Sequence, residues 1–278
     1  MDDEQRSGAQ AALWNGDGGR GWVATSAVLD ELFRPIERLL LDAVPPAARH
    51  ALDVGCGTGS TTVAVARRLG PGGSAVGIDV SAPMLAAARA RADREGVRAT
   101  FVVADAQTHP LEPARFDAIL SRFGVMFFDD AAAAFANLRR AARPGAALCC
   151  VAWRGAAENP FMTAAERAAA PLLSNLPTRR PNEPGPFAFS DRDRVRGVLE
   201  DSGWSAIDVR PVDVPCTMPA RALPSYLAEL GPVGRALQNA DDTLRARVLD
   251  AVLPAFAPYV RGAEVHITAA CWRIAAQA

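Results

Sequence analysis

The stretch Ala51-Leu-Asp-Val-Gly-Cys-Gly-Thr-Gly-Ser60 decides the fold. It begins as a short apolar strand that contains the carboxylate of Asp53, and glycines at 55, 57 and 59 then lead into a helix that starts near Thr61. Glycine accepts a positive φ and lets a ligand approach the main chain closely. A strand, a glycine-rich turn and a helix at this spacing predict the first βα unit of a doubly wound nucleotide-binding sheet.

The turn differs from the dinucleotide-binding fingerprint. That fingerprint would place its third glycine at position 60, where this chain has Ser60. Asp53, two residues before the first glycine, suits a cationic ammonium group better than a pyrophosphate. A nicotinamide-dependent oxidoreductase is therefore disfavoured.

The rest of the chain predicts an α/β fold. Strands are expected over 50–54, 75–78, 100–103, 116–121, 146–153, 207–214 and 264–274, and the main helices over 28–41, 60–69, 81–95, 131–142, 160–173, 191–202, 222–238 and 241–253. Strands that alternate with helices predict a parallel sheet with right-handed crossovers. The expected fold is a doubly wound, seven-stranded, mostly parallel, Rossmann-like sheet with helical insertions.

The domain organisation follows from where this alternation stops. We expect residues 1–47 to form a helical N-terminal lid and residues 48–278 to form the ligand-binding domain. Segments at about 154–189 and 222–257 interrupt the alternation and are expected to be cap insertions. Long connections in a compact domain are usually functional or disordered, and helical periodicity argues against disorder here.

Composition excludes several classes of function. A net charge of −1 over 278 residues gives no basic field for nucleic acid, and no apolar stretch is long enough to cross a membrane. All 30 basic residues are arginine, which rules out a lysine Schiff base and a P-loop lysine. The five dispersed cysteines suggest reduced thiols and a cytoplasmic protein. With three widely spaced histidines, no metal site is expected.

Two further acids follow predicted strands. Asp79 ends the second strand, where doubly wound folds use a carboxylate to accept hydrogen bonds from ribose hydroxyl groups. Asp105 and Ala106 follow the third strand, where a carboxylate can accept from the exocyclic amine of an adenine. Three acids at three successive strand ends are more specific than a glycine turn alone.

The pattern Leu-Asp-Val-Gly-Cys-Gly-Thr-Gly, Gly-Ile-Asp, Ala-Asp-Ala and Arg-Pro-Gly resembles class I S-adenosylmethionine-dependent methyltransferases over about residues 48–153. The stretch 116–128 resembles their ubiquinone/menaquinone-biosynthesis-type branch, which includes many small-molecule enzymes. The resemblance implies S-adenosylmethionine as cofactor. It also implies methyl transfer to an O, N or C atom of a small, apolar or aromatic metabolite, by in-line displacement at the sulfonium methyl. Some relatives bind the cofactor without methylating, so a cyclase or a regulatory module is the alternative. The expected state is a monomer or a homodimer.

The resemblance also implies roles for individual residues. Asp53, Gly55, Cys56 and Gly57 would face the methionine part of the cofactor, Asp79 the ribose, Asp105 and Ala106 the adenine edge, Val80 and Met84 the adenine ring, and Ser121 the region near the sulfonium. Trp22, together with Trp14, either closes over the cofactor or packs in the core.

Candidate residues for the acceptor are less constrained. His266, at the start of the last strand, is the best candidate for a general base, or it is a strand histidine satisfied by its neighbours. Arg122 could hold an acidic group of substrate or cofactor, or pair with an acid such as Asp129. Aromatic residues predict either an acceptor pocket or core packing, and they are Phe123, Phe127, Phe128, Trp153, Phe161 and Tyr226. Alignment behind an activated methyl group can suffice, so no single catalytic residue is required.

Overall fold

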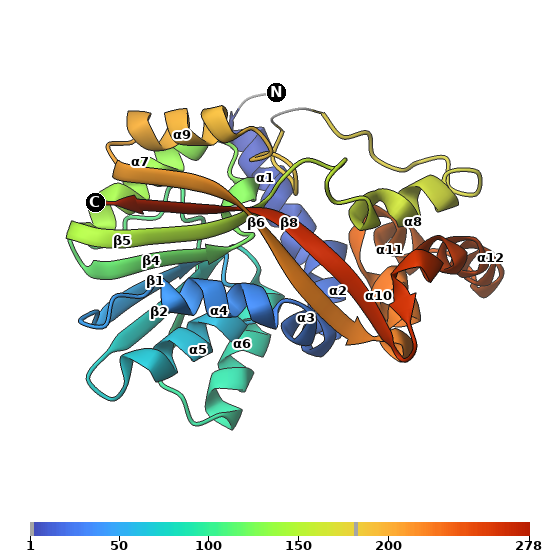
Figure 1. Ribbon diagram of the computed structural model, residues 1–278, viewed down its shortest axis with the longest axis horizontal. Coiled ribbons are helices and arrows are strands. Elements are labelled where there is room, and N and C mark those ends of the chain that lie inside the picture. Colours follow the sequence, from blue (N-terminus) through green and yellow to red (C-terminus); the bar gives the residue numbers. More distant parts are fainter. Residues whose placement is uncertain (1–2, 181–182) are drawn as a thin grey trace.

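A computed structural model describes residues 3–180 and 183–278, and it is built around one twisted sheet (Figure 1). Seven strands run in the order β3-β2-β1-β4-β5-β8-β6, and the two-residue strand β7 (Val260–Arg261) pairs with β8 at one end. Strands β1 to β5 are parallel, whereas β8 is antiparallel to both of its long neighbours. The expected doubly wound, mostly parallel sheet is confirmed.

The parallel half of the sheet carries the glycine turn. Its strands are β1 (His50–Val54), β2 (Ser74–Asp79), β3 (Thr100–Val103), β4 (Phe116–Arg122) and β5 (Ala142–Trp153). Helices α4 (Arg34–Asp42), α5 (Ser60–Leu69) and α6 (Ala82–Arg94) cover one face, and α7 (Ala131–Ala141) and α9 (Arg192–Asp201) cover the other (Figure 1). The strand order reverses between β1 and β4, and ligands of such sheets bind beyond the strand ends at this point.

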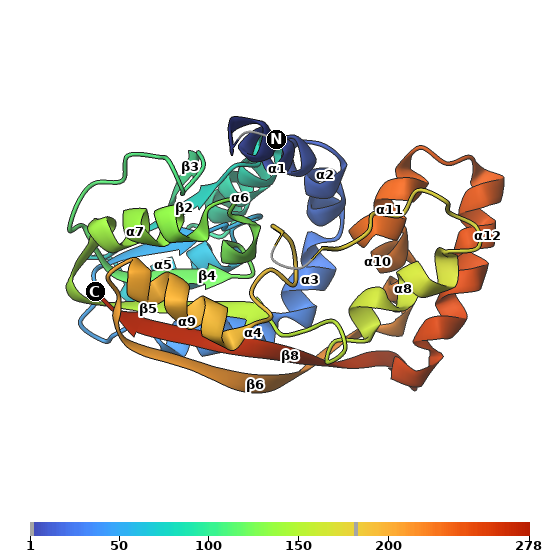
Figure 2. The ribbon, with the colours of Figure 1, turned by 90° about the horizontal axis from the view of Figure 1, so that it is seen from above.

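The first part of the chain is helical. Helices α1 (Asp3–Asn15), α2 (Asp17–Ala24) and α3 (Ser26–Leu32) precede α4 and lie near the carboxyl ends of the parallel strands (Figure 2). The sequence predicted one helix over 28–41, but the structure has α3 and α4 with Phe33 between them. Pro35 lies in the first turn of α4, where a missing N–H is tolerated, so a new helix begins there.

The antiparallel strands are longer than predicted. Strands β6 (Ser205–Pro219) and β8 (Glu264–Gln277) pair from Ser205 with Gln277 to Pro219 with Glu264, whereas β5 reaches only as far as Cys271 of β8. Beyond that point the two strands form a ribbon that leaves the sheet and reaches a group of helices (Figures 1 and 2).

That helical group has two sources in the sequence. Helix α8 (Phe161–Ala169) follows β5, and α10 (Leu223–Glu229), α11 (Gly231–Gln238), α12 (Asp242–Val252) and the 3-10 helix η3 (Leu253–Tyr259) lie between β6 and β7. The 3-10 helices η1 (Val125–Phe127) and η2 (Ala220–Ala222) are the remaining short elements. One helix was predicted over 222–238, but Leu230 is extended and Gly231 has a positive φ, so the structure has two.

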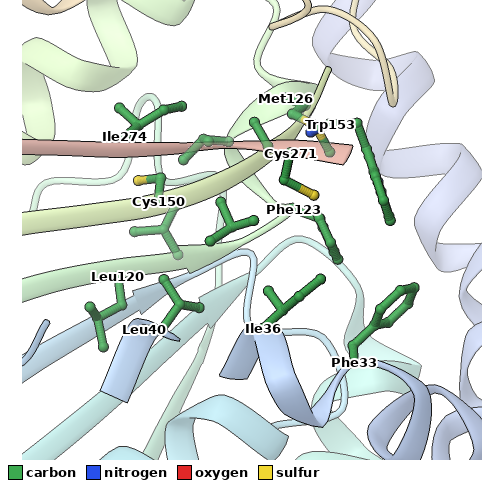
Figure 3. Close-up of a cluster of buried hydrophobic side chains, with 14 of the residues drawn as sticks. Phe33, Ile36, Leu40, Leu120, Phe123, Met126, Cys150, Trp153, Cys271 and Ile274 are labelled. Carbon is green, nitrogen blue, oxygen red and sulfur yellow. The ribbon is translucent and has the colours of Figure 1, made fainter. Parts of the chain in front are cut away.

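Buried apolar side chains join these parts. Figure 3 shows Ile36 and Leu40 of α4 packed toward Leu120 of β4, with Cys150 and Ile274 on the neighbouring strands. Phe33, Phe123 and Trp153 continue the cluster toward the carboxyl ends of the strands. None of the described helices has the length and apolar character needed to span a bilayer.

Candidate active site at the strand ends

The glycine turn is held against β2 by main-chain hydrogen bonds. The amides of Gly55 and Cys56 donate to the carbonyl oxygen of Ile78 at 2.9 and 3.2 Å. Gly55 has a φ of +65°, and a Cβ atom there would lie 2.6 Å from Cα of Gly124, which leaves no room for a side chain. The turn therefore needs glycine at 55 because another backbone segment approaches it.

Gly57 is glycine for a different reason. Its φ is +54°, but a Cβ atom would meet nothing closer than Nε1 of Trp22 at 3.7 Å and Sδ of Met84 at 3.8 Å. Both of these side chains, like Gly57 itself, line the main cavity. The open space in front of Gly57 thus lets a ligand approach the main chain.

Asp79 links the end of β2 to the glycine turn. Its Oδ2 accepts a hydrogen bond from the amide of Gly57 at 2.9 Å, and its Oδ1 accepts one from the amide of Ser81, also at 2.9 Å. The carboxyl group is buried, and desolvation raises its pKa although these amides act in the opposite direction. Each oxygen retains a second lone pair, so the group can still accept from a ligand.

Asp53 is a buried acid at the end of β1. Burial raises the pKa of its carboxyl group to about 7, although the hydroxyl of Thr62, which donates to Oδ2 at 2.6 Å, and the charge of Arg122 both lower it. The charges of Glu37 and Asp79 raise the pKa further. A cationic ligand group beside Asp53 would favour its charged form.

One cavity of about 530 Å³ collects most of the predicted cofactor residues. Ten of them line it, namely Trp22, Asp53, Gly55, Cys56, Gly57, Asp79, Val80, Met84, Asp105 and Ala106. Oδ1 of Asp105 accepts a hydrogen bond from the amide of Gln107 at 2.8 Å, which fixes the turn after β3. Residues from three strand ends and from the N-terminal helices therefore share one space.

Ser121 has a different position from the one expected. It does not belong to the described cavity lining, and its hydroxyl is fully buried below it. Oγ donates to the carbonyl of Val54 at 2.8 Å and accepts from the amides of Gly124 and Val125 at 3.1 and 3.2 Å. Ser121 therefore holds the loop after β4 in place, through hydrogen bonds that are made to the main chain.

His266 also lies outside the described lining of the cavity. It pairs with Thr217 on the ribbon, and its Nε2 is 3.2 Å from Glu264. Trp153, the last residue of β5, pairs with Cys271, so His266 lies five residues beyond the strand ends, roughly 17 Å along an extended chain. The predicted position of His266 was wrong because β8 begins beyond the edge of the sheet and not at it.

The N-terminal helices are bonded to the loop after β2. The side chain of Asn15 donates to the carbonyl of Val80 and accepts from the amide of Ala82, both at 2.9 Å. The hydroxyl of Ser81 donates to the carbonyl of Trp14 at 2.6 Å. Trp14 and Trp22 line the cavity with their rings edge-to-face at 6.1 Å, so these two tryptophans pack together and also face the site.

Aromatic side chains form a further part of the cavity lining. The rings of Phe123 and Trp153 are stacked, with centroids 4.3 Å apart and planes 6° from parallel, and Phe33 meets Phe123 edge-to-face at 5.2 Å (Figure 3). Tyr226 of α10 also lines the cavity, and burial raises the pKa of its phenol to about 12. This aromatic part of the cavity can hold an apolar or aromatic molecule.

Several residues that line the cavity were not predicted from the sequence. Thr61, Gln10, Phe33 and Arg235 all belong to the lining. Thr61 follows the glycine turn directly and could have been found from its place in the first turn of the helix. The other three could not, because only the packing of α1, of α11 and of the junction between α3 and α4 brings them to the site.

The comparisons with known proteins agree with this geometry. Residues 51–145 match the family model described as "Methyltransferase domain". Nocamycin O-methyltransferase of Saccharothrix syringae is 40% identical over 116 residues, which are 41% of this chain and 41% of that protein. Demethylmenaquinone methyltransferase of Roseiflexus castenholzii is 36% identical over 132 residues, 48% of this chain and 49% of that protein. These alignments span half or less of the length of either relative.

Solved structures share the fold over most of the chain. A phosphoethanolamine N-methyltransferase 2 from Haemonchus contortus has a TM-score of 0.59 at 19% identity, covering 96% of this chain and 59% of that one. The [4+2]-cyclase SpnF has a TM-score of 0.57 at 19% identity, covering 93% and 94%. At this identity the likeness concerns the fold alone.

The fold is the Rossmann-like fold that solved methyltransferase structures share. The sequence matches support the resemblance to S-adenosylmethionine-dependent methyltransferases over the domain 51–145.

Proposed function

We propose that this protein transfers the methyl group of S-adenosylmethionine to a small, apolar or aromatic acceptor. The observation that carries the proposal is one cavity that is lined both by the acids and glycines of the strand ends and by a stacked pair of aromatic side chains. A methyl donor and an acceptor need such a shared space. The relatives named O-methyltransferase and demethylmenaquinone methyltransferase support the same class of reaction.

The residues present fit the cofactor. Asp53 can hold its ammonium group, the open side of Gly57 can lie along the methionine part, and Asp79 retains acceptor capacity for the ribose. Asp105 and Ala106, with Val80 and Met84, would surround the adenine. When bound, S-adenosylmethionine supplies a methyl group that its sulfonium makes electrophilic.

The chain itself mainly aligns the reactants and excludes water. None of the cavity-lining residues in the described parts of the chain is a histidine or a lysine, so the structure offers no imidazole base at the site. We propose that the stacked pair Phe123 and Trp153 positions the acceptor. Alignment of reacting groups can lower a barrier by roughly 7–11 kcal/mol.

We further propose that the N-terminal segment 1–47 and the segments 154–189 and 222–257 act together as a lid on the domain 48–278. Helix α11 contacts α2, where Nε2 of Gln238 donates to the carbonyl of Asp17 at 3.1 Å. Tyr226, Phe161 and Trp22, one residue from each of these segments, line the same cavity. Closure of this kind would exclude water from the methyl group.

The five free, buried cysteines support a reducing, cytoplasmic location.

The test of this proposal measures which molecule receives the labelled methyl group. The protein is incubated with methyl-labelled S-adenosylmethionine and a panel of small phenols, quinols and carboxylic acids, and the products are read by mass spectrometry. A labelled acceptor together with S-adenosylhomocysteine supports the proposal. Retention of intact cofactor while an acceptor is converted would favour the alternative, a cyclase that does not methylate. Failure of S-adenosylhomocysteine to bind in calorimetry would refute both.

A further inference from the structure

Arg122, the last residue of β4, has an unused hydrogen-bonding group beside the cavity. Its side chain is 9% exposed and lines the cavity, and its Nη1 is buried without a hydrogen-bond partner. The nearest acids are Asp30, 3.9 Å from Nη2, and Glu37, 4.0 Å from Nη1. These distances are too long for hydrogen bonds.

Both acids are already engaged with other partners. Asp30 accepts from the guanidinium of Arg91, and Glu37 accepts from the hydroxyl of Ser60. They balance the charge of Arg122 without satisfying its donors. A buried donor without a partner is costly, so the site favours a ligand that supplies an acceptor.

Thr61 has a second unpartnered polar atom in the same lining. It lies in the first turn of α5, is 2% exposed, and its Oγ1 has no hydrogen-bond partner. Its neighbours in the chain face the acids around Arg122, because Ser60 donates to Glu37 and Thr62 donates to Asp53. Thr61 therefore stands between two residues of α5 that contact Glu37 and Asp53, and both of these acids lie near Arg122.

The other cavity-lining arginines come from other segments of the chain. Arg179 is paired with Glu166 of α8 at 2.5 Å, Arg180 is 3.4 Å from Glu183, and Arg235 lies on α11. Only Arg122, among the arginines that line the cavity in the described parts of the chain, lies close enough to Asp53 to lower the pKa of its carboxyl group. An anion and a cation are thus presented side by side at the glycine turn.

We infer that Arg122 and Thr61 bind the carboxylate of the amino-acid part of the cofactor, opposite Asp53, which binds the ammonium group. The guanidinium would donate charge-assisted hydrogen bonds and the threonine hydroxyl one further bond. The pair Asp53 and Arg122 would thereby recognise the zwitterion of an α-amino acid. This inference rests on the proposed function, because it assigns residues to the cofactor named there.

Three ligands separate the groups of the amino acid. S-adenosylhomocysteine carries both amine and carboxylate, 5′-deoxy-5′-(3-aminopropylthio)adenosine carries the amine alone, and 5′-deoxy-5′-methylthioadenosine carries neither. For Arg122→Gln we expect calorimetry to show an affinity for S-adenosylhomocysteine that is about 10- to 100-fold weaker. The affinities for the other two ligands should stay within about twofold of wild type, because neither offers a carboxylate.

Two further variants complete the test. Thr61→Val keeps the shape of the side chain and should weaken only S-adenosylhomocysteine, by about 3- to 10-fold. Arg91→Gln is the matched control, since Arg91 pairs with Asp30 in the same ionic cluster but does not belong to the described lining. It should leave the ratio of the three affinities unchanged.

The ratio of affinities decides the outcome. If Arg122→Gln leaves all three affinities unchanged, or weakens all three equally, the inference is overturned. Should Arg122→Gln fail to fold, Thr61→Val decides by the same ratio. A wild-type protein that binds none of the three ligands refutes the proposed function itself and is distinguishable from either result.

Discussion

The amide of Gly57 donates a 2.9 Å hydrogen bond to Oδ2 of Asp79, so the glycine turn after β1 and the end of β2 form one unit. The same carboxylate holds the amide of Ser81 at the start of α6. Two loops that a ligand would touch are therefore fixed by one buried side chain.

Asp79→Ala should weaken binding of S-adenosylhomocysteine by about 1.5–3 kcal/mol, because hydrogen bonds to a charged group are lost. It should also lower the free energy of unfolding, because two main-chain amides lose their acceptor. Calorimetry and urea titration measure the two effects.

Asp117→Ala is the control for that change. Asp117 accepts from the amides of Arg49 and His50, both at 2.8 Å, at the opposite end of the sheet. The Asp117→Ala protein should lose stability in the same way and keep its affinity for S-adenosylhomocysteine. An Asp79→Ala protein that folds and binds like wild type would remove Asp79 from the site.

The pKa of about 7 at Asp53 makes the ligand-free protein sensitive to pH. The folded pKa lies above the ordinary value of 3.8, so the protonated group stabilises the fold fully below pH 3.8, and this contribution is lost as the pH rises to about 7. The change is on the order of 4 kcal/mol. Relative to Asp53→Asn, wild type should therefore lose stability between pH 4 and about 7.

The affinity for S-adenosylhomocysteine should change with pH in the opposite direction to the stability. An ammonium group favours the ionised carboxylate, so the affinity of wild type for S-adenosylhomocysteine should rise with pH up to about 7. In Asp53→Asn this rise should disappear. Calorimetry at several pH values measures it, and parallel profiles for the two proteins would show that Asp53 does not meet the ammonium group.

A methyl group added at Gly57 should block the ligand. Gly57→Ala places its Cβ in open space at the cavity, so the variant should fold, at a cost of about 1–2 kcal/mol for the positive φ, and bind S-adenosylhomocysteine at least about tenfold more weakly. Gly96→Ala is the matched control, because Gly96 has a φ of +63° and no atom within 4 Å of an added Cβ. The Gly96→Ala protein should bind S-adenosylhomocysteine with the affinity of wild type. Equal affinities of the Gly57→Ala and Gly96→Ala proteins would show that the ligand does not lie against Gly57.

Removal of the helices between β6 and β8 should separate binding from transfer. Pro219 pairs with Glu264, so an Asn-Gly turn can join these residues in place of 220–263. The shortened protein should bind S-adenosylhomocysteine but lose methyl transfer. The milder change Gln238→Ala removes the hydrogen bond to Asp17 and should raise KM for the acceptor. If the shortened protein keeps a near-normal kcat/KM, this segment is not part of the lid.

His266→Ala should leave kcat within about twofold of wild type, because a general base must lie within hydrogen-bond reach of the proton that it removes. The variant should also keep the wild-type pH profile of kcat. A fall of two orders of magnitude with unchanged cofactor affinity would assign the base to His266 despite its place on the ribbon.

Ten residues that the sequence assigned to the cofactor line one cavity, because the segments that carry most of them are local. The order of strand, glycine turn and helix places Asp53 and Gly57 within a few residues of each other, and Asp79 follows the next strand. Ser121 and His266 were misplaced for a different reason. The direction of a side chain at a strand end, and the distance that β8 extends past β5, depend on pairing between strands that are far apart in the sequence.

The aromatic part of the cavity could be predicted only in outline. Phe123 and Trp153 were named as aromatic candidates, but their stacking depends on β4 and β5 being neighbours in the sheet. The sequence could not predict that Nη1 of Arg122 lacks a hydrogen-bond partner, since the acids near it come from α3 and α4. Long-range packing sets these relationships, and no local pattern encodes it.

The ribbon formed by β6 and β8 allows the segment that it carries to change independently of the sheet. The segment between Pro219 and Glu264 leaves the ribbon and returns to it at paired residues, so its length can change without moving the register of any strand. Insertions or replacements there would alter the walls around an acceptor and leave the strand-end acids in place. A chain built in this way can acquire a new substrate while its cofactor chemistry stays constant.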